Sequence, residues 1–366
     1  MTPDTKATAR RVRALETEVE GLRAHNEELV RQLEVARTGR VLRAARGVRA
    51  EARVARDGLR VSWRRHTQPR LGTLWQSAPE PLRVPRAYLR ARPPSRAPSV
   101  TIVTPSFCSV RWLERTLRSV LDQGYPALEY VVQDGGSDDG TIDLLKRHAP
   151  ALARWASEPD RGQAHAINQG FAGTAGEIMA FLNADDVLLP GALAHVAAFF
   201  AAHPEVDVVY GHRVMIDANG HRVGLWITPP HREDALLPVD WVPQETLFWR
   251  RRAWDAAGGR LDEDLQYALD WDLLLRLRSS GATFQRLPRL LAAFRVHPAQ
   301  KTQALAERGE AECRALRARY AGAPLSHGAA AAAARPYLRR AVAHHLVFRA
   351  AERLPRRRVT VPAGPL

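Results

Sequence analysis

Between residues 99 and 300 the sequence alternates short apolar runs with segments of helical periodicity, and this alternation restricts the fold more than any other feature. The apolar run in SVTIVTPSF precedes the helical pattern of WLERTLRSVLDQ, and YVVQD, IMAFLN and VDVVYG supply further apolar runs. Strands that alternate with helices form a mostly parallel sheet with helices on both faces. We therefore expect a Rossmann-like α/β domain whose ligands bind beyond the carboxyl ends of its strands.

Acidic residues directly follow two of the expected strands. Asp134 lies in QDGGSDDGT, and Asp185 and Asp186 end FLNADD. A carboxylate at a strand end serves neither sheet pairing nor burial, and two adjacent carboxylates offer hard oxygen ligands to a Mg²⁺ or Mn²⁺ that holds a diphosphate. A structural alternative is that Asp138, Asp139 and Asp186 cap the helices that follow them.

Six motifs between residues 99 and 302 occur in the order found in one enzyme family. They are TPSFC, QDGGSDDGT, SEPDRGQAHAINQG, FLNADD, VPQETLFWRRRAWDAAGGRLDEDLQYALDWDLLLRL and FRVHPAQKT. Together they resemble the family 2 glycosyltransferases, which have the GT-A fold. The resemblance implies transfer of a sugar, with inversion, from a nucleotide-diphosphate donor such as a UDP-sugar to a glycan or lipid-linked acceptor. It also implies a divalent metal, Mn²⁺ or Mg²⁺, and a place in cell-surface polysaccharide or glycolipid assembly.

The resemblance assigns donor-binding roles residue by residue. The positions that would surround the nucleotide are Thr104, Pro105, Ser106, Asp134, Asp160, Arg161 and Asn168. The family's metal motif corresponds to Asn183-Ala184-Asp185, an Asn variant of Asp-x-Asp. This correspondence makes Asp185 the principal metal ligand, with Asp186 as a second candidate.

Further polar residues fall in the C-terminal half of the same domain. The positions that would contact the donor, its diphosphate or the acceptor are Gln244, Glu245, His297 and Lys301, although loop packing and an ordinary structural histidine are alternatives. YALDWDLLLRL resembles the region that supplies the catalytic base, with Asp270 as the first candidate and Asp272 as the second. An inverting displacement needs a base opposite the leaving nucleotide. If one of these two carboxylates faces the cleft, the other is free to cap or to pair.

The N-terminal residues 12–36 carry a heptad repeat. Its a positions are Val12, Val19, Asn26 and Leu33, and its d positions are Leu15, Leu22, Leu29 and Ala36. This pattern predicts a parallel two-stranded coiled coil over residues 1–38, and hence a homodimer, with a single amphipathic helix packed on its own domain as the alternative.

The segments between and beyond these parts are basic. Residues 39–98 combine an Arg-rich helical segment, suited to an anionic membrane surface or to solvent, with a Pro-rich linker that begins at residue 79. The GT-A domain is expected over residues 99–302. Residues 303–366 predict two C-terminal helices and a basic tail.

The formal net charge of +15 is distributed unevenly. Residues 1–98 hold 22 Lys or Arg against 10 Asp or Glu, and residues 301–366 hold 13 against 4, whereas residues 99–300 hold 19 against 25. The expected domain is therefore acidic and only its flanks are basic. Because aromatic residues are sparse among the basic ones, we expect no specific nucleic-acid partner.

The sequence lacks features that several classes of protein require. The only cysteines are Cys108 and Cys313, and no apolar stretch suits a signal peptide or a membrane span, so we expect a cytoplasmic protein, soluble or peripheral on the inner face of the cell membrane. A nucleotidyltransferase would need a glycine-rich phosphate loop after the first strand, and TPSFCSVRWLERT contains no glycine. An inactive scaffold that recruits partners through its coiled coil and basic flanks is the remaining alternative.

Overall fold

The computed structural model describes residues 74–298, 300–301, 306–321, 327–352, 354 and 357–364. Contacts divide the chain into two units, residues 1–66 and 67–366, and everything below concerns the second. The predicted coiled coil at residues 12–36, with the homodimer it implies, and the Arg-rich segment that follows lie outside the described residues. Within the described part, no helix combines the length and apolar character that a membrane span requires.

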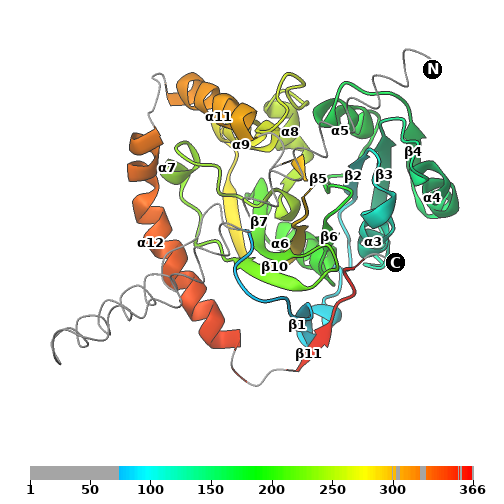
Figure 1. The fold of residues 1–366 in the computed structure, drawn as a ribbon, viewed down its shortest axis with the longest axis horizontal. Helices are drawn as coiled ribbons and strands as arrows, with labels where there is room; N and C mark the ends of the chain where they lie inside the picture. Colours follow the sequence, from blue (N-terminus) through cyan, green and yellow to red (C-terminus); the bar gives the residue numbers. More distant parts are fainter. Residues whose placement is uncertain are drawn as a thin grey trace, which may run out of the picture. The chain divides into compact units, whose positions relative to one another are not determined.

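One half of the central sheet is parallel (Figure 1). Its strands, in spatial order, are β4 (Arg154–Ser157), β3 (Leu128–Asp134), β2 (Val100–Ser106) and β5 (Ile178–Phe181). Each neighbouring pair runs parallel, and helices connect the strands along the chain. This half matches the fold that alternation of strands and helices predicts.

The other half of the sheet is mixed, so the expectation of a mostly parallel sheet is wrong here. Its strands are β9 (Phe248–Arg250), β7 (Val208–Ile216), β10 (Phe284–Arg295), β6 (Val187–Leu188) and β8 (Arg222–Trp226). Only β7 and β10 pair in parallel, whereas β9 is antiparallel to both β5 and β7, β6 to β10, and β8 to β7. Very short strands such as β9 and β6 carry too few residues to show a periodic pattern, and their direction is set by partners distant in sequence.

Helices cover both faces of the sheet, as expected. Along β2 the side chains alternate, so that Val100 and Ile102 face one hydrophobic cluster and Val103 faces the other. Helices α3 (Val110–Leu121), α4 (Thr141–His148) and α6 (Ala192–Ala202) pack on the first face. Helices α5 (Gln163–Phe171), α7 (Glu233–Leu236), α8 (Arg251–Ala256) and α9 (Leu269–Ser279) pack on the second.

The two helices predicted near the C-terminus are confirmed as α11 (Ala306–Ala321) and α12 (His327–Glu352). They join the cluster on the second face, to which α11 contributes Leu316 and α12 contributes Tyr337, both about 3% exposed. These helices are therefore part of the domain's core on the side that carries α9.

The Pro-rich segment expected to be a linker contains regular structure. Its β1 (Arg83–Pro85) pairs antiparallel with β11 (Arg358–Thr360), and a 3-10 helix, η2 (Arg86–Arg90), follows. Leu82 and Val84 are buried in a cluster that also holds Val361. Proline is tolerated here because this sheet has only two strands, and a strand at a sheet edge can lack an N–H donor.

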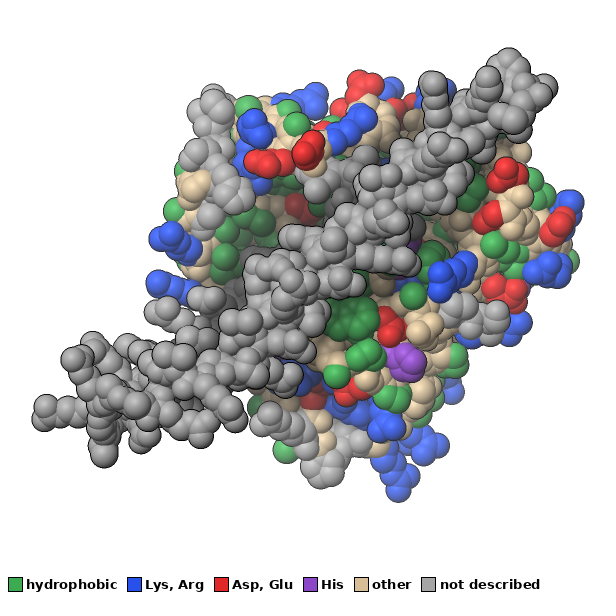
Figure 2. Space-filling model, viewed as in Figure 1, with side chains coloured by type: hydrophobic (Ala, Val, Ile, Leu, Met, Phe, Trp, Pro, Cys, Tyr) green, Lys and Arg blue, Asp and Glu red, His purple; other side chains and the backbone are tan. Residues whose placement is uncertain are grey.

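Acidic and basic side chains are interspersed on the face of the described part shown in Figure 2. This distribution agrees with the presence of both charge signs over residues 99–300, where acidic residues moderately outnumber basic ones.

Candidate functional site

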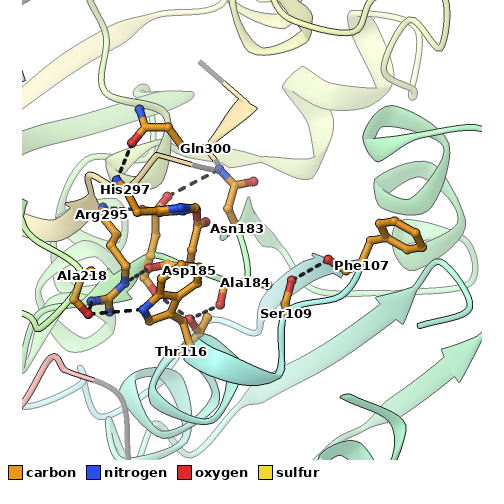
Figure 3. A network of polar contacts seen from close by, with 12 residues as sticks. Phe107, Ser109, Thr116, Asn183, Ala184, Asp185, Ala218, Arg295, His297 and Gln300 are labelled. Atoms are coloured by element: carbon orange, nitrogen blue, oxygen red, sulfur yellow. Dashed lines mark hydrogen bonds and ion pairs between the residues drawn. The ribbon is translucent and has the colours of Figure 1, made fainter. Parts of the chain in front are cut away.

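The centre of the candidate site is a pair formed by Asp185, which follows β5, and His297, which follows β10 (Figure 3). The Nε2 of His297 lies 2.9 Å from the Oδ2 of Asp185, and the imidazole donates to the carboxylate. Trp112 on α3 lies against the imidazole with ring centroids 4.2 Å apart. The Asp185 side chain is 30% exposed while that of His297 is 7% exposed, so the carboxylate reaches the surface and the imidazole supports it from within.

Arg295 holds the turn that carries Asp185. Its Nε donates to the carbonyl oxygen of Asp185 at 2.8 Å, and its backbone N–H donates to the Oδ1 of Asp186 at 3.0 Å. Its Nη2 donates to the carbonyl of Ala363 at 2.6 Å. The side chain is fully buried, and desolvation lowers the pKa of Arg295 to about 10. The segment next to the C-terminal strand therefore anchors the turn through this guanidinium.

Asp186 differs from its neighbour because its side chain is turned inward. It is 1% exposed, and the amide of Asn183 lies 3.4 Å from its second carboxylate oxygen. Burial, followed by the charges of Asp185 and Glu245, raises the pKa of Asp186 well above its ordinary value. The Asp186 side chain therefore anchors the turn. It does not take the outward position expected of a second metal ligand.

A chain of amide and ammonium groups lines the same region. The Nζ of Lys301 donates to Gln163 at 2.8 Å, Gln163 donates to the Oδ1 of Asn183 at 2.7 Å, and Asn183 donates to Gln244 at 3.2 Å. Gln244 in turn donates to the carbonyl of Phe181 at the end of β5. The predicted residues at positions 183, 244 and 301 are therefore brought together. Gln163 was missed by sequence reasoning, although it lies within the quoted motif SEPDRGQAHAINQG.

Glu245 is held by an ion pair. Arg213 on β7 donates to both of its carboxylate oxygens, at 2.6 and 2.5 Å, and the Glu245 side chain is 1% exposed. The guanidinium of Arg213 also lies over the ring of Phe294, 4.4 Å from its centroid. Glu245 therefore exposes little surface to which a ligand could bind. Its negative charge, balanced by Arg213, lies behind the site.

Asp134 organises the loop after β3. The backbone N–H groups of Gly136 and Ser137 and the hydroxyls of Ser137 and Ser157 all donate to its carboxylate, at 2.6 to 3.1 Å. The side chain is fully buried. A carboxylate accepts about four hydrogen bonds, so Asp134 is saturated by this loop and would influence a bound ligand only through the loop's shape.

An open surface lies beside that loop. A Cβ at Gly135 would come within 3.2 Å of the Phe107 ring and 2.7 Å of the Asp160 carboxylate, so these three residues are in close contact. Phe107 is 66% exposed although it is a large aromatic residue. Sequence reasoning did not select Phe107, and its signal was its place directly after the apolar run of β2.

Several predicted nucleotide-binding residues face other parts of the protein. Thr104, Pro105 and Ser106 are buried in β2, where the hydroxyl of Thr104 pairs with that of Tyr130. Asn168 exchanges hydrogen bonds with the backbone of Leu261, and it also donates to Glu263. Their residue types fit the family motif, but in this chain their side chains support the walls of the site.

Arg161 and Asp160 begin the turn before α5. The guanidinium of Arg161 is 69% exposed and pairs with Glu263 at 2.6 Å. Asp160 accepts the N–H of Gly162 at 2.7 Å, which fixes the turn. The exposed guanidinium leaves donor groups of Arg161 open to solvent at this edge.

The two aspartates of α9 have different surroundings. Asp272 is fully buried, pairs with Arg276 at 2.7 Å and accepts the hydroxyl of Tyr320 at 3.2 Å. Asp270 is partly exposed and accepts only the N–H of Trp271, at 2.9 Å, within the described part of the chain. Because Asp272 is fully engaged, the geometry leaves Asp270 as the candidate base.

Asp240, which sequence reasoning missed, lies near Asp270. One of its carboxylate oxygens is buried and has no hydrogen-bond partner among the described residues. Burial, followed by the charge of Asp270, raises the pKa of Asp240 well above its ordinary value, and burial also raises the pKa of Asp270. A single aspartate between Val239 and Trp241 gave no motif that could have identified it.

The partly exposed carboxylate of Asp185 could offer oxygen ligands to a divalent cation, with the His297 imidazole donating to it from within. A search of the described residues finds no cluster of three or more His, Cys, Asp or Glu side chains that could hold a metal. The carboxylate and the imidazole are nevertheless adjacent, and the Nδ1 of His297 is buried without a partner there. Mg²⁺ in nucleotide sites is commonly held by one or two protein ligands together with substrate phosphates.

Three comparisons relate this geometry to known proteins. A family model described as Glycosyl transferase family 2 matches residues 101–256. An uncharacterized glycosyltransferase of Mycobacterium tuberculosis is 42% identical over 182 residues, which is 49% of this chain and 69% of that protein. The O-antigen biosynthesis protein RfbC of Myxococcus xanthus is 34% identical over 242 residues, which is 64% of this chain but only 18% of that protein.

The fold has a counterpart among solved structures. The crystal structure of S. aureus TarS 1-349 in complex with UDP-GlcNAc matches with a TM-score of 0.52 at 17% sequence identity, over 70% of this chain and 76% of that one. At this identity the likeness concerns the fold.

Proposed function

Because this chain belongs to glycosyltransferase family 2, we propose that it transfers a sugar from a nucleotide-diphosphate donor to a hydroxyl of a glycan or lipid-linked acceptor. The observation that carries the proposal is the arrangement of three functional groups in one domain. The Asp185–His297 pair lies at the strand ends, the exposed Phe107 lies beside Gly135, and the partly exposed Asp270 begins α9. These groups supply a diphosphate site, a surface for a nucleobase and a base.

The donor is proposed to be a UDP-sugar. The exposed ring of Phe107 offers a face on which a base can stack, and the glycine at 135 keeps that surface free of side-chain atoms. The partly exposed guanidinium of Arg161 would lie near the ribose. TarS, which shares the fold, was crystallised with UDP-GlcNAc, and this supports the choice of nucleotide.

The diphosphate is proposed to bind at Asp185 and His297 with Mn²⁺ or Mg²⁺. When bound, the cation would stabilise the negative charge that the leaving diphosphate gains. Lys301 adds a positive charge through its contact with Gln163, although burial lowers the pKa of Lys301. The buried Arg295 keeps the Asp185 turn fixed, so the ligands need not rearrange during transfer.

Asp270 is proposed to accept the proton of the acceptor hydroxyl. The hydroxyl oxygen then attacks the anomeric carbon, the bond between that carbon and the diphosphate oxygen breaks, and its electron pair leaves with the nucleotide diphosphate. Attack opposite the leaving group inverts the anomeric configuration. Burial raises the pKa of Asp270, which makes its carboxylate a stronger base than an exposed aspartate.

The proposed setting is the assembly of a surface polysaccharide or glycolipid at the inner face of the cell membrane. The similarity to RfbC of Myxococcus xanthus supports the polysaccharide part of this proposal. The homodimer through residues 12–36 and the membrane contact of the basic flanks belong to the same proposal, and both concern segments outside the described residues.

The direct test is a screen of the full chain for thermal stabilisation by UDP, GDP, dTDP and CMP, each with Mn²⁺ and with a chelator. A ligand that binds only the folded protein raises its Tm. We expect UDP with Mn²⁺ to raise the Tm, and Asp185→Ala to abolish that rise. If no nucleotide changed the Tm, the inactive scaffold would become the better reading of the fold.

A further inference from the structure

Helix α11 contacts the approach to α9 through one carboxylate. The backbone N–H groups of Gln266, Tyr267 and Ala268 all donate to Glu312, at 3.0, 2.8 and 3.0 Å. These three residues directly precede α9, whose second residue is Asp270. Glu312 therefore holds the segment that leads into the proposed base.

This contact is stronger than an ordinary helix cap. Hydrogen bonds to an ionised acceptor are roughly twice as strong as neutral ones, and a negative charge is favourable at a helix N-terminus. Desolvation alone would raise the pKa of Glu312, but the three backbone N–H groups and Arg308 hold that pKa below its ordinary value. The carboxylate is therefore ionised at neutral pH, and Arg308 orients it from one turn earlier at 2.9 Å.

The two surfaces also meet closely. A Cβ at Gly309 would lie 2.7 Å from the ring of Tyr267, so the helix backbone of α11 rests directly on that ring. From about three turns beyond Gly309 on α11, Tyr320 donates to Asp272 at 3.2 Å. Helix α11 thus holds the segment before α9 through Glu312. It also holds the inward-facing Asp272 through Tyr320. Figure 1 shows α11 beside α9.

We propose that Glu312 is a positioning residue of the transfer reaction, which fixes the backbone at residues 266–268 so that Asp270 points toward the acceptor. This inference rests on the proposed function, because it assigns Asp270 the role of base. Residues two apart on a helix point in directions about 160° apart. When Asp272 is held in the interior and the first turn of α9 is fixed, Asp270 therefore points outward. Both Glu312 and α9 lie beyond residues 101–256, which the family model matches.

The test uses Glu312→Ala and Glu312→Gln in the full chain, with Glu310→Ala as the matched control. Glu310 is two residues away on the same helix, and its side chain is 64% exposed in a surface pair with Arg314. The first measurement is the rate of nucleoside diphosphate release from the nucleotide sugar picked out by the nucleotide screen, with water in place of the acceptor. The second is amide hydrogen exchange at residues 266–270, and the third is stabilisation by the nucleotide with Mn²⁺.

We expect Glu312→Ala to lower kcat by ~10- to 100-fold, since misplacing a reacting group by about 1 Å can cost that much. The donor KM and the nucleotide-dependent rise in Tm should stay within about twofold of the wild type, because Asp185 and His297 are not contacted by α11. Exchange at residues 266–268 should be faster. Glu312→Gln retains one acceptor oxygen and should recover part of kcat, and Glu310→Ala should match the wild type.

Two results would overturn the inference. If exchange became faster while kcat stayed at the wild-type value, Glu312 would stabilise the fold without serving the reaction. If nucleotide affinity fell as much as kcat, the effect would pass through Lys301, whose pKa is also influenced by Glu312. Should Glu312→Ala fail to fold, Glu312→Gln decides between these results. A wild-type protein that bound no nucleotide would instead count against the proposed function itself.

Discussion

The two halves of the sheet hold their functional side chains in different ways. In the parallel half, the carboxylate of Asp134 is bound by donors that lie two, three and 23 residues away, within adjacent strand-end loops. At the junction with the mixed half, the Asp185 turn between β5 and β6 is held by Arg295, 110 residues away, and the approach to Asp270 is held by Glu312, more than 40 residues away. The proposed nucleotide side is therefore built mainly from contacts between neighbouring strand ends, while the proposed transfer side depends on segments far along the chain.

The largest effect is expected where the two halves meet. Asp185→Ala removes the exposed carboxylate of the Asp185–His297 pair, and we expect kcat for nucleoside diphosphate release to fall ~10²- to 10³-fold, together with loss of Mn²⁺-dependent nucleotide binding. Asp143→Ala, at an exposed site on α4 paired only with Lys146, is the control. Undiminished turnover in Asp185→Ala would remove the metal assignment.

The second prediction separates the two aspartates of α9. Asp270→Asn should lower kcat by ~10²- to 10⁴-fold while leaving the Tm and nucleotide binding nearly unchanged, because only the proton acceptor is lost. Asp272→Asn should instead lower the stability of the domain by ~2–4 kcal/mol, since Arg276 loses its buried partner. Steady-state kinetics and urea unfolding of both variants check this contrast, and a reversal of the two patterns would exchange their roles.

The third prediction concerns the local anchoring of the nucleotide side. Asp134→Asn replaces an acceptor oxygen with an amide that cannot accept, so one or two loop donors lose their partner, and we expect ~1–3 kcal/mol less stability with weaker nucleotide binding. Asp138→Asn, in the exposed part of the same loop, should leave both unchanged. Urea unfolding and nucleotide titration provide the readouts. Tight nucleotide binding despite a disordered loop would contradict the shaping role of Asp134.

The smallest effect is a change in how stability depends on pH. Burial raises the pKa of Asp240, so the folded protein binds this proton more tightly than the unfolded chain does. The stability that Asp240 contributes is then fully present at pH values below its pKa in the unfolded chain. It is lost as the pH rises through its pKa in the folded protein. Asp240→Asn removes this loss of stability, and we expect a gain of ~0.5–1 kcal/mol at pH 7 and a Tm that falls less as the pH rises above the ordinary pKa of an aspartate. An unchanged pH profile of the Tm would show that the buried oxygen is solvated.

Sequence patterns predicted β2, β3 and β5 of the parallel half because each contains a recognisable apolar run, whereas β4 was not predicted. The strands Leu128–Asp134 and Val100–Ser106 have seven residues each, contain short apolar runs and end in recognisable polar turns. The three residues of β9 and the two of β6 offer no such pattern, and β1 is bordered by prolines that suggested a linker. Their pairing depends on partners that are distant in sequence.

The same division applies to the residues of the site. Motif order selected Asp185, His297 and Asp270 as candidates, because each follows or begins an element that the sequence makes recognisable. Phe107 and Gln163 lay within or beside the motifs but carried no separate signal. Asp240 and Glu312 lay outside any pattern, because a single acidic residue on a loop or helix is indistinguishable from a solvated one until its neighbours are known.

The sequence by itself determined the family, the α/β class and the strand ends at which the site is proposed, since hydrophobic period and motif order are properties of the chain read in order. Only the tertiary structure decided which carboxylates face outward. Asp185 and Asp186 are adjacent, and Asp270 and Asp272 are two apart, yet in each pair one is buried against a cation or an amide and the other is partly exposed. Their partners, Arg295, Arg276 and Tyr320, reach them through folding, and the cost of burying an unpaired charge then fixes each orientation.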